Sequence, residues 1–125
     1  MKYKKLKNWM YWWGPAVIWM GVIFIASSLP HRLPTPGLDF RLDDKFQHAL
    51  AYAVLGALMW RALNGKATGW KRMWMAFILT AVYALTDECH QSLTPNRRCD
   101  PLDLIADAIG ALATVVILQY KDRRR

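Results

Sequence analysis

The chain has 125 residues, of which 54% are hydrophobic, and its formal net charge is +8 at pH 7. This length predicts one domain over residues 1–125. This composition is highly apolar and includes seven tryptophans, which excludes a disordered chain and argues against a simple nucleic-acid-binding protein. The Lys and Arg residues gather at the ends of apolar segments instead of along one helix face, which is typical of membrane proteins.

The first element is "NWMYWWGPAVIWMGVIFIASSLP", which carries no charge. A helix of about 20 residues crosses the ~30 Å hydrocarbon core of a bilayer, so the sequence predicts a transmembrane helix over about residues 9–29. The four lysines that precede it also resemble the start of a signal peptide. The apolar run is long for that class and "IASSLP" is a poor cleavage site, so an uncleaved span is favoured.

Three further apolar segments reach spanning length only if polar residues at one end are included. They predict spans over about residues 45–63, 72–90 and 101–120. The expected fold is therefore an all-α, integral membrane four-helix bundle. The near-neutral mean hydropathy leaves a soluble four-helix bundle as an alternative. "LNGKATGW" is typical of a short turn, and "PHRLPTPGLDFRLDD" of an extended loop, because proline and glycine oppose helix.

Charge asymmetry predicts the topology, because Lys- and Arg-rich flanks stay in the cytoplasm. With both termini cytoplasmic, twelve basic residues lie inside and five outside, whereas all acids except Asp122 belong to the outer half. Six of the seven tryptophans then fall near the inner interface, where indole rings are favoured. The outer basic residues are Arg32, Arg41, Lys45, Arg97 and Arg98.

This topology brings polar helix ends together on the outer side, and spacings of three and four place several ionisable residues on shared helix faces. These sets are Asp44, His48 and Tyr52 on the second span, Tyr83, Asp87 and Gln91 on the third, and Asp100, Asp103 and Asp107 on the fourth. The last face continues to Gly110, where a small residue favours close helix approach.

Helix capping explains part of this pattern. Asp100 is a good N-cap, Pro101 suits the first helical position, and an acid such as Asp103 is favourable in the first turn. Asp107 lies a turn deeper, and capping does not explain it. A charged residue at the bilayer centre costs about 2.5–3.5 kcal/mol, so the charged residues of these spans must be shallow, hydrated or paired. Arg97 and Arg98 are the expected partners.

Several chemistries fit these residues. A histidine beside carboxylates suits acid–base catalysis, and His48 could also activate Ser27 or Ser28, although no nucleophile motif is present. A metal site is a further alternative, but no His-x-x-x-His or Glu-x-x-His pair fixes ligands on one helix, and we expect no metal or other cofactor. Cys89 and Cys99 either form a disulfide or stay free.

Two stretches, "DDKFQHALAYAVLG" and "TDECHQSLTPNRRCDPLDLIADAIGA", resemble the VanZ-like family of small bacterial membrane proteins, and the similarity covers nearly the whole chain. The positions that match the family pattern are Asp44, Lys45, His48, Tyr52, Asp87, Glu88, Gln91, Pro95, Arg97, Asp103, Asp107 and Gly110. Asn96 departs from it by replacing the usual Gly, and Asp107 stands where Asn is frequent. Both cysteines lie outside the pattern.

The resemblance implies a four-helix membrane protein of a family whose namesake confers low-level resistance to the glycopeptide teicoplanin. It does not imply that this chain confers resistance. Our hypothesis is a multi-pass protein of the bacterial inner membrane whose outward-facing polar cluster binds or modifies a cell-envelope amphiphile. That amphiphile would be a lipid-linked wall precursor, a lipid headgroup or a glycopeptide. In the alternative, the cluster is a structural lock between helices and function lies in partner proteins.

The hypothesis assigns two groups of residues. Positioning of the ligand or proton transfer falls to His48, Asp87, Glu88, Asp103 and Asp107. Binding falls to Asp44, Lys45, Tyr52, Gln91, Arg97 and Arg98, with the arginines holding an anionic group. Membrane lipids are the expected partners and nucleic acid is not, because the basic ends of the spans already have anionic lipid to attract.

Overall fold

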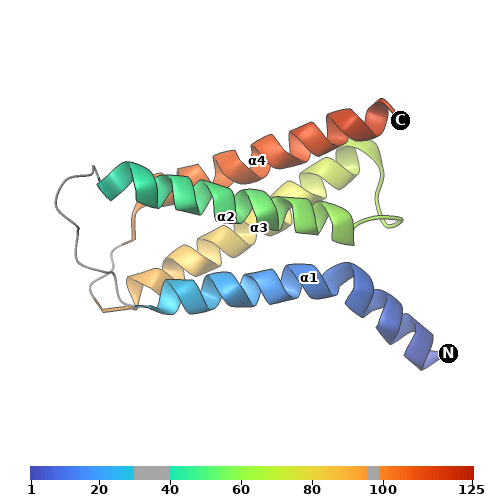
Figure 1. Ribbon diagram of the computed structural model, residues 1–125, viewed down its shortest axis with the longest axis horizontal. Helices are drawn as coiled ribbons and strands as arrows, with labels where there is room; N and C mark the ends of the chain where they lie inside the picture. Colours follow the sequence, from blue (N-terminus) through green and yellow to red (C-terminus); the bar gives the residue numbers. More distant parts are fainter. Residues whose placement is uncertain (30–39, 96–98) are drawn as a thin grey trace.

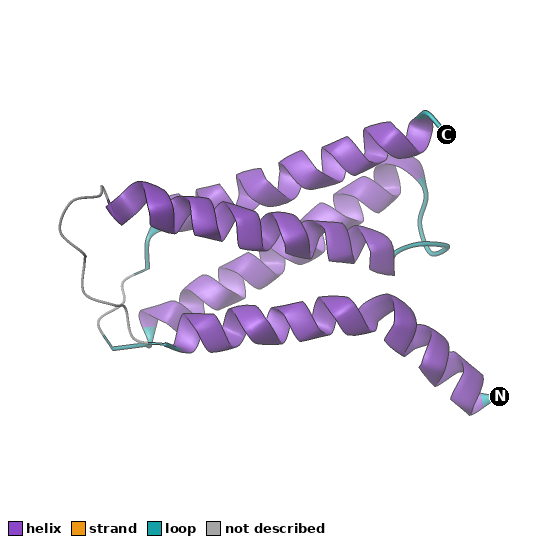
Figure 2. Ribbon diagram, in the orientation of Figure 1, coloured by secondary structure: helices purple, strands orange, loops and turns teal. Residues whose placement is uncertain are grey.

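The computed structural model describes residues 1–29, 40–95 and 99–125, with the backbone alone for residues 40–44. These residues form four helices and no strand, so the all-α prediction is confirmed (Figures 1 and 2). The helices are α1 (Lys2–Ser28), α2 (Phe40–Ala62), α3 (Gly69–Ser92) and α4 (Pro101–Arg123). Each predicted helical segment falls on one of them. By length and composition, α1 and α4 are apolar enough to cross a membrane.

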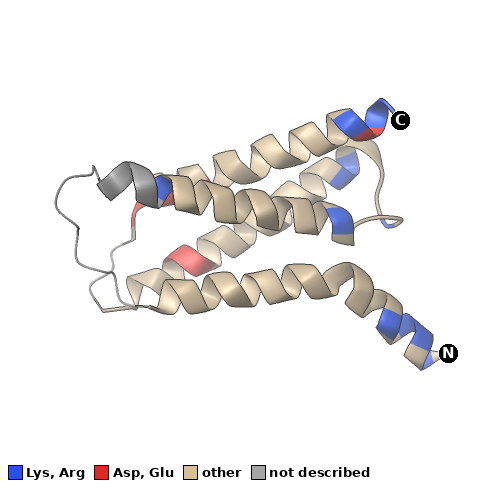
Figure 3. Cartoon of the chain, viewed as in Figure 1, with Lys and Arg blue, Asp and Glu red and all other residues tan. Residues whose placement is uncertain are grey.

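The two ends of the molecule differ in charge (Figure 3). Both chain termini and the α2–α3 connection lie at one end, with most of the Lys and Arg residues that the structure describes, and we call it the basic end. At the other, acidic end, α1 and α3 finish and α2 and α4 begin. By their positions near the end of α3 and the starts of α2 and α4, the residues at the acidic end include Asp87, Glu88, Asp100, Asp103 and Asp107, together with Lys45. Among the described residues, charge is therefore segregated along the helix axes.

Helices α2 and α4 approach each other closely at Gly110. A Cβ atom at this position would lie 2.0 Å from the backbone oxygen of Ala49, so only glycine fits between the helices. A second contact lies two turns further along α2, where a Cβ on Gly56 would meet the backbone oxygen of Ala111 at 3.3 Å. The predicted close approach at Gly110 is thus confirmed, and it fixes the register of α2 against α4.

Helix α1 packs on α2 and α3. Its outer side carries exposed apolar residues, including Ile18 and Ile25, which suits contact with lipid. Pro15 lies inside α1 and has no N–H, so the carbonyl of Tyr11 loses its usual helical donor. The guanidinium of Arg61 on α2 donates to that carbonyl at 2.8 Å. This contact ties the bent first half of α1 to the basic end of α2 (Figure 1).

Candidate functional site

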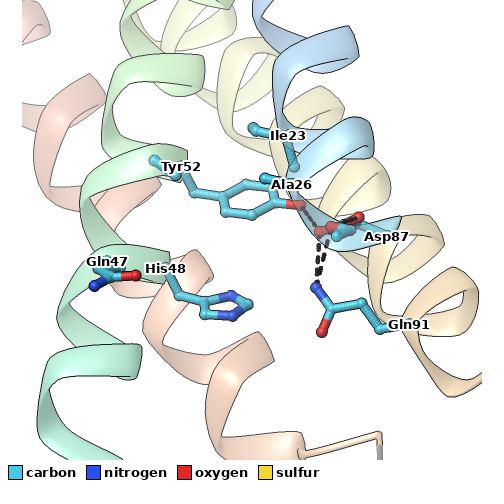
Figure 4. Close-up of a pocket in the computed structure, with 9 residues that line it drawn as sticks. Ile23, Ala26, Gln47, His48, Tyr52, Asp87 and Gln91 are labelled. Atoms are coloured by element: carbon cyan, nitrogen blue, oxygen red, sulfur yellow. Dashed lines mark hydrogen bonds between the residues drawn. The ribbon is translucent and has the colours of Figure 1, made fainter. Parts of the chain in front are cut away.

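Asp87 is the centre of a hydrogen-bond network that joins three helices. Its carboxylate is 5% exposed and accepts from the Ser27 hydroxyl at 2.5 Å and from the Tyr52 hydroxyl at 2.9 Å. Gln91, one turn further along α3, donates to Asp87 Oδ2 at 3.3 Å and to Ser27 Oγ at 3.2 Å. The spacing of four that placed Asp87 and Gln91 on one face thus also directs both towards α1 and α2 (Figure 4).

A second polar group joins α2 to α4. Lys45 Nζ lies 2.9 Å from Asp100 Oδ2 and 2.5 Å from Asp103 Oδ1. One turn deeper, His48 Nδ1 lies 3.0 Å from Asp107 Oδ1, and its Nε2 lies 3.9 Å from Asp103 Oδ2. The imidazole therefore sits between two carboxylates, and Asp107 is only 1% exposed. The expectation that these acids must be paired is met by residues of α2.

Glu88 connects α3 to the start of α4. Its Oε1 accepts from the backbone N–H of Asp100 at 2.6 Å, while the Asp100 side chain accepts from the Leu102 N–H at 2.9 Å. The predicted role of Asp100 as the N-cap is therefore confirmed. The second oxygen of Glu88 is buried and has no hydrogen-bond partner within the described part of the chain. Glu88 is 2% exposed, so this orphaned oxygen is a local cost in stability.

A cavity of about 260 Å³ opens beside Asp87, between α1, α2 and α3 (Figure 4). Its lining is both polar and apolar, as suits a molecule with a headgroup and a hydrocarbon portion. The lining residues are Ile23, Ala26, Ser27, Gln47, His48, Ala51, Tyr52, Asp87 and Gln91. None of them is Lys or Arg, and Asp87 is the one acidic residue among them.

The geometry allows proton binding at the cavity wall. If His48 Nδ1 carries a proton, it donates to Asp107, and that bond orients the ring that lines the cavity. A histidine oriented by a carboxylate is the usual arrangement for acid–base chemistry. Ser27 is engaged with Asp87, not with His48, so the considered pairing of Ser27 with His48 has no support in the geometry. Ser28 instead contacts His90 Nε2 at 2.9 Å.

The structure thus gathers most of the predicted site residues into two neighbouring groups. The Asp87 network contains Tyr52 and Gln91. The group that joins α2 to α4 contains Lys45, His48, Asp103 and Asp107, and Glu88 contacts the start of α4 beside it. The predicted roles of the Asp44 side chain, Arg97 and Arg98 lie outside the described residues.

Two contributors escaped the sequence prediction. Gln47 lines the cavity, and its position next to His48 on α2 was the available signal. His90 stacks on Phe24 with ring centroids 4.5 Å apart, and only its place beside Gln91 could have indicated it. Among the described His, Cys, Asp and Glu residues, no group of three is arranged to hold a metal ion.

Cys89 and Cys99 are both free and exposed. Partial desolvation and the neighbouring Glu88 carboxylate raise the pKa of the Cys99 thiol, which lies in the connection between α3 and α4. A raised pKa means less thiolate at a given pH, so Cys99 should react with alkylating reagents more slowly than an unperturbed thiol below that pKa.

The family assignment rests on one comparison. A family model described as VanZ/LLP1 matches residues 12–121, which is nearly the whole chain and includes every residue of the polar network and the cavity. No curated protein and no solved structure gives a significant match. Together with the two apolar helices, the match indicates a membrane protein of the VanZ type. The chain belongs to the VanZ/LLP1 family.

Proposed function

We propose that the protein is a multi-pass protein of the bacterial inner membrane with its basic end in the cytoplasm. Charge segregation supports this orientation, because basic flanks remain on the cytoplasmic side. Under this topology the cavity and the polar network lie at the outer face, where they meet envelope components. The short connections between α2 and α3 and between α3 and α4 suit helices that cross the same membrane in alternating directions.

Thiol labelling tests this orientation. In a Cys89→Ser variant, Cys99 becomes the only cysteine, and a membrane-impermeant maleimide added to intact spheroplasts should label it. Because the thiol pKa is raised, the labelling rate should increase as the pH is raised towards that pKa. The matched control is Lys71→Cys in a chain whose Cys89 and Cys99 are both replaced by Ser, and this cysteine at the basic end should react only after lysis. The opposite pattern would reverse the assignment.

The cavity beside Asp87 binds the polar headgroup of a cell-envelope amphiphile in this proposal. The observation that carries it is the mixed lining, in which Tyr52, Asp87 and Gln91 face the same space as Ile23 and Ala26. Polar groups of this kind fix the orientation of a ligand, and the apolar residues accommodate its hydrocarbon portion. The His48 ring at the wall would position the headgroup or exchange a proton with it.

The size of the cavity favours one of the candidate amphiphiles. Pockets that enclose drug-sized ligands measure about 300–1,000 Å³, and this cavity of about 260 Å³ is smaller. It admits a single small headgroup. A glycopeptide or the whole polar part of a lipid-linked wall precursor would not fit inside, so contact with either would involve surfaces beyond the cavity. We therefore favour a lipid headgroup over both.

Filling the cavity tests the proposal. Ala26→Phe places a ring in the space beside Asp87, and it should remove lipid that co-purifies with the wild-type protein in mild detergent, as measured by mass spectrometry. Ile25→Phe is the matched control, because Ile25 is the neighbouring residue on α1 and is 64% exposed. Equal lipid retention by both variants would contradict binding in the cavity.

A second candidate function has its own supporting observation. Lys45, His48 and Glu88 each contact an acid or backbone group of another helix, which is what a structural lock requires. In that case the family's polar residues hold the helices in register and function lies in partner proteins. Substitutions in a structural lock should lower stability, whereas substitutions in a headgroup site should lower lipid retention, so measuring both quantities distinguishes the two functions.

A further inference from the structure

We propose that the cavity binds a primary ammonium group carried by a lipid, with Asp87 as its counter-ion. This inference rests on the proposed headgroup site and names the chemical class of the ligand. It concerns the part of the cavity where Asp87 meets Tyr52 and Gln91 (Figure 4).

The first argument is the charge on Asp87. A carboxylate that is 5% exposed has lost most of its hydration, and burying such a charge is costly unless it is paired. Ser27, Tyr52 and Gln91 supply three hydrogen bonds, but all three donors are neutral. Within the described residues no Lys, Arg or His forms an ion pair with Asp87. A cationic ligand would supply the missing charge.

The second argument is that the charged groups described around the cavity disfavour an anion beside Asp87. Asp103 and Asp107 add negative charge on α4, and Lys45 is already shared between Asp100 and Asp103. His48 lies between Asp103 and Asp107, so a proton on its ring is balanced by those acids rather than by Asp87. These described charges would therefore repel a phosphate placed directly against Asp87, whereas they would attract an ammonium group there.

The third argument concerns the number of N–H donors. Asp87 has about four lone-pair sites and three are used, and the hydroxyl oxygens of Ser27 and Tyr52 are further acceptors on the lining. A primary ammonium offers three N–H donors, which matches the free site on Asp87 together with the hydroxyl oxygens of Ser27 and Tyr52 that touch it. A quaternary ammonium has none and is usually held by several aromatic faces, and Tyr52 is the one benzenoid ring of the lining.

The fourth argument is access from the lipid phase. Ile23, Ala26 and Ala51 form the apolar part of the lining, and α1 beside them has an exposed apolar outer side. An amine attached to a lipid can thus enter with its ammonium towards Asp87 while its apolar portion remains against α1 and the bilayer. A soluble amine would gain nothing from these contacts.

Native mass spectrometry of the detergent-solubilised full chain tests the inference. Phosphatidylethanolamine, phosphatidylcholine and phosphatidylglycerol with identical acyl chains are the probes. We expect the ethanolamine lipid to bind about tenfold more tightly than the other two, since hydrogen bonds to charged groups contribute that much. Asp87→Asn should abolish the preference. Asp122→Asn is the matched control, because Asp122 is an exposed acid at the basic end.

A second variant guards against loss of folding in Asp87→Asn. Ala26 is exposed and lines the cavity next to Asp87, so Ala26→Lys should fold normally while placing a competing ammonium beside the site. It should reduce binding of the ethanolamine lipid to the level of the other lipids. Binding of that lipid by Ala26→Lys at the wild-type level would overturn the inference.

The remaining outcomes separate the inference from the proposed function. Equal binding of all three lipids, with Ala26→Phe still reducing it, would refute the ammonium assignment and leave the headgroup site standing. No lipid bound above the Ala26→Phe level would refute the headgroup site itself. Free phosphoethanolamine that displaces the lipid at equal concentration would refute the lipid as the source and support a soluble amine.

Discussion

Gly110→Ala is expected to lower the thermal stability of the protein sharply. The added Cβ would lie 2.0 Å from the backbone oxygen of Ala49, and also within 3 Å of its carbonyl carbon and Cα. Because these are backbone atoms, no side-chain rotation relieves the clash, and α2 must move away from α4. Overpacking of this kind costs about 1–3 kcal/mol, and occasionally more. Thermal unfolding in detergent measures the loss.

Two other glycines provide graded controls for this prediction. Gly56→Ala meets the Ala111 oxygen at 3.3 Å, so a shift of a few tenths of an ångström accommodates it and the loss should be small. Gly21 on α1 has nothing within 4 Å of its would-be Cβ, and Gly21→Ala should stabilise the helix by roughly 0.5–1 kcal/mol. From most to least stable, the expected order is therefore Gly21→Ala, wild type, Gly56→Ala and Gly110→Ala. Equal stability of the three variants would show that α2 and α4 do not depend on this contact.

The parts of the fold and the site that the sequence could predict are those that depend on local signals. Local signals were sufficient for the four helices, for Asp100 as the N-cap and for the shared faces of α2, α3 and α4, because these depend only on helical periodicity and capping. Gly110 could be read as a point of close approach because a small residue on a polar face suits helix packing.

The partners of the carboxylates could not be predicted in this way. Proximity along the chain favoured Arg97 and Arg98, which lie outside the described residues, whereas Lys45 and His48 of α2 form the ion pairs that the structure describes. Periodicity shows which residues share a face but not which face meets another. That depends on the register of α2 against α4, which the Gly110 contact with Ala49 fixes.

The cavity depended on long-range packing for the same reason. Ser27 reaches Asp87 only because α1 lies against α2 and α3 with its last turn facing the network. Nothing in the spacing of α1 specifies that rotation. The Tyr83 hydroxyl donates to the carbonyl of Met20 at 2.6 Å, and the Trp19 indole donates to that of Ala51 at 2.9 Å. These two contacts fix α1 in place, and they join residues that are far apart in the sequence.

His48→Leu is expected to destabilise the protein strongly, whereas adding Asp107→Leu should restore much of the loss. Asp107 is 1% exposed and the contact to His48 is 3.0 Å, so removing the imidazole leaves a buried carboxylate without its partner. Breaking a buried pair in this way costs about 3–5 kcal/mol. Replacing both residues by apolar ones removes the unpaired charge as well, which is often nearly neutral. Thermal unfolding of the two single variants and the double variant gives the comparison.

The double variant also distinguishes the two proposed functions. Suppose that the His48–Asp107 pair is a structural lock and that Asp87 is the ligand site. A double variant of restored stability should then still bind the ethanolamine lipid, because Ser27, Tyr52 and Gln91 still hold Asp87 in place. If His48 and Asp107 themselves recognise the headgroup, stability returns without binding. If the polar residues serve only as a scaffold, neither the wild type nor the double variant prefers any lipid, and Asp87→Asn changes stability alone. Stability and lipid binding must therefore be measured on the same samples, since only their combination assigns a role to each half of the network.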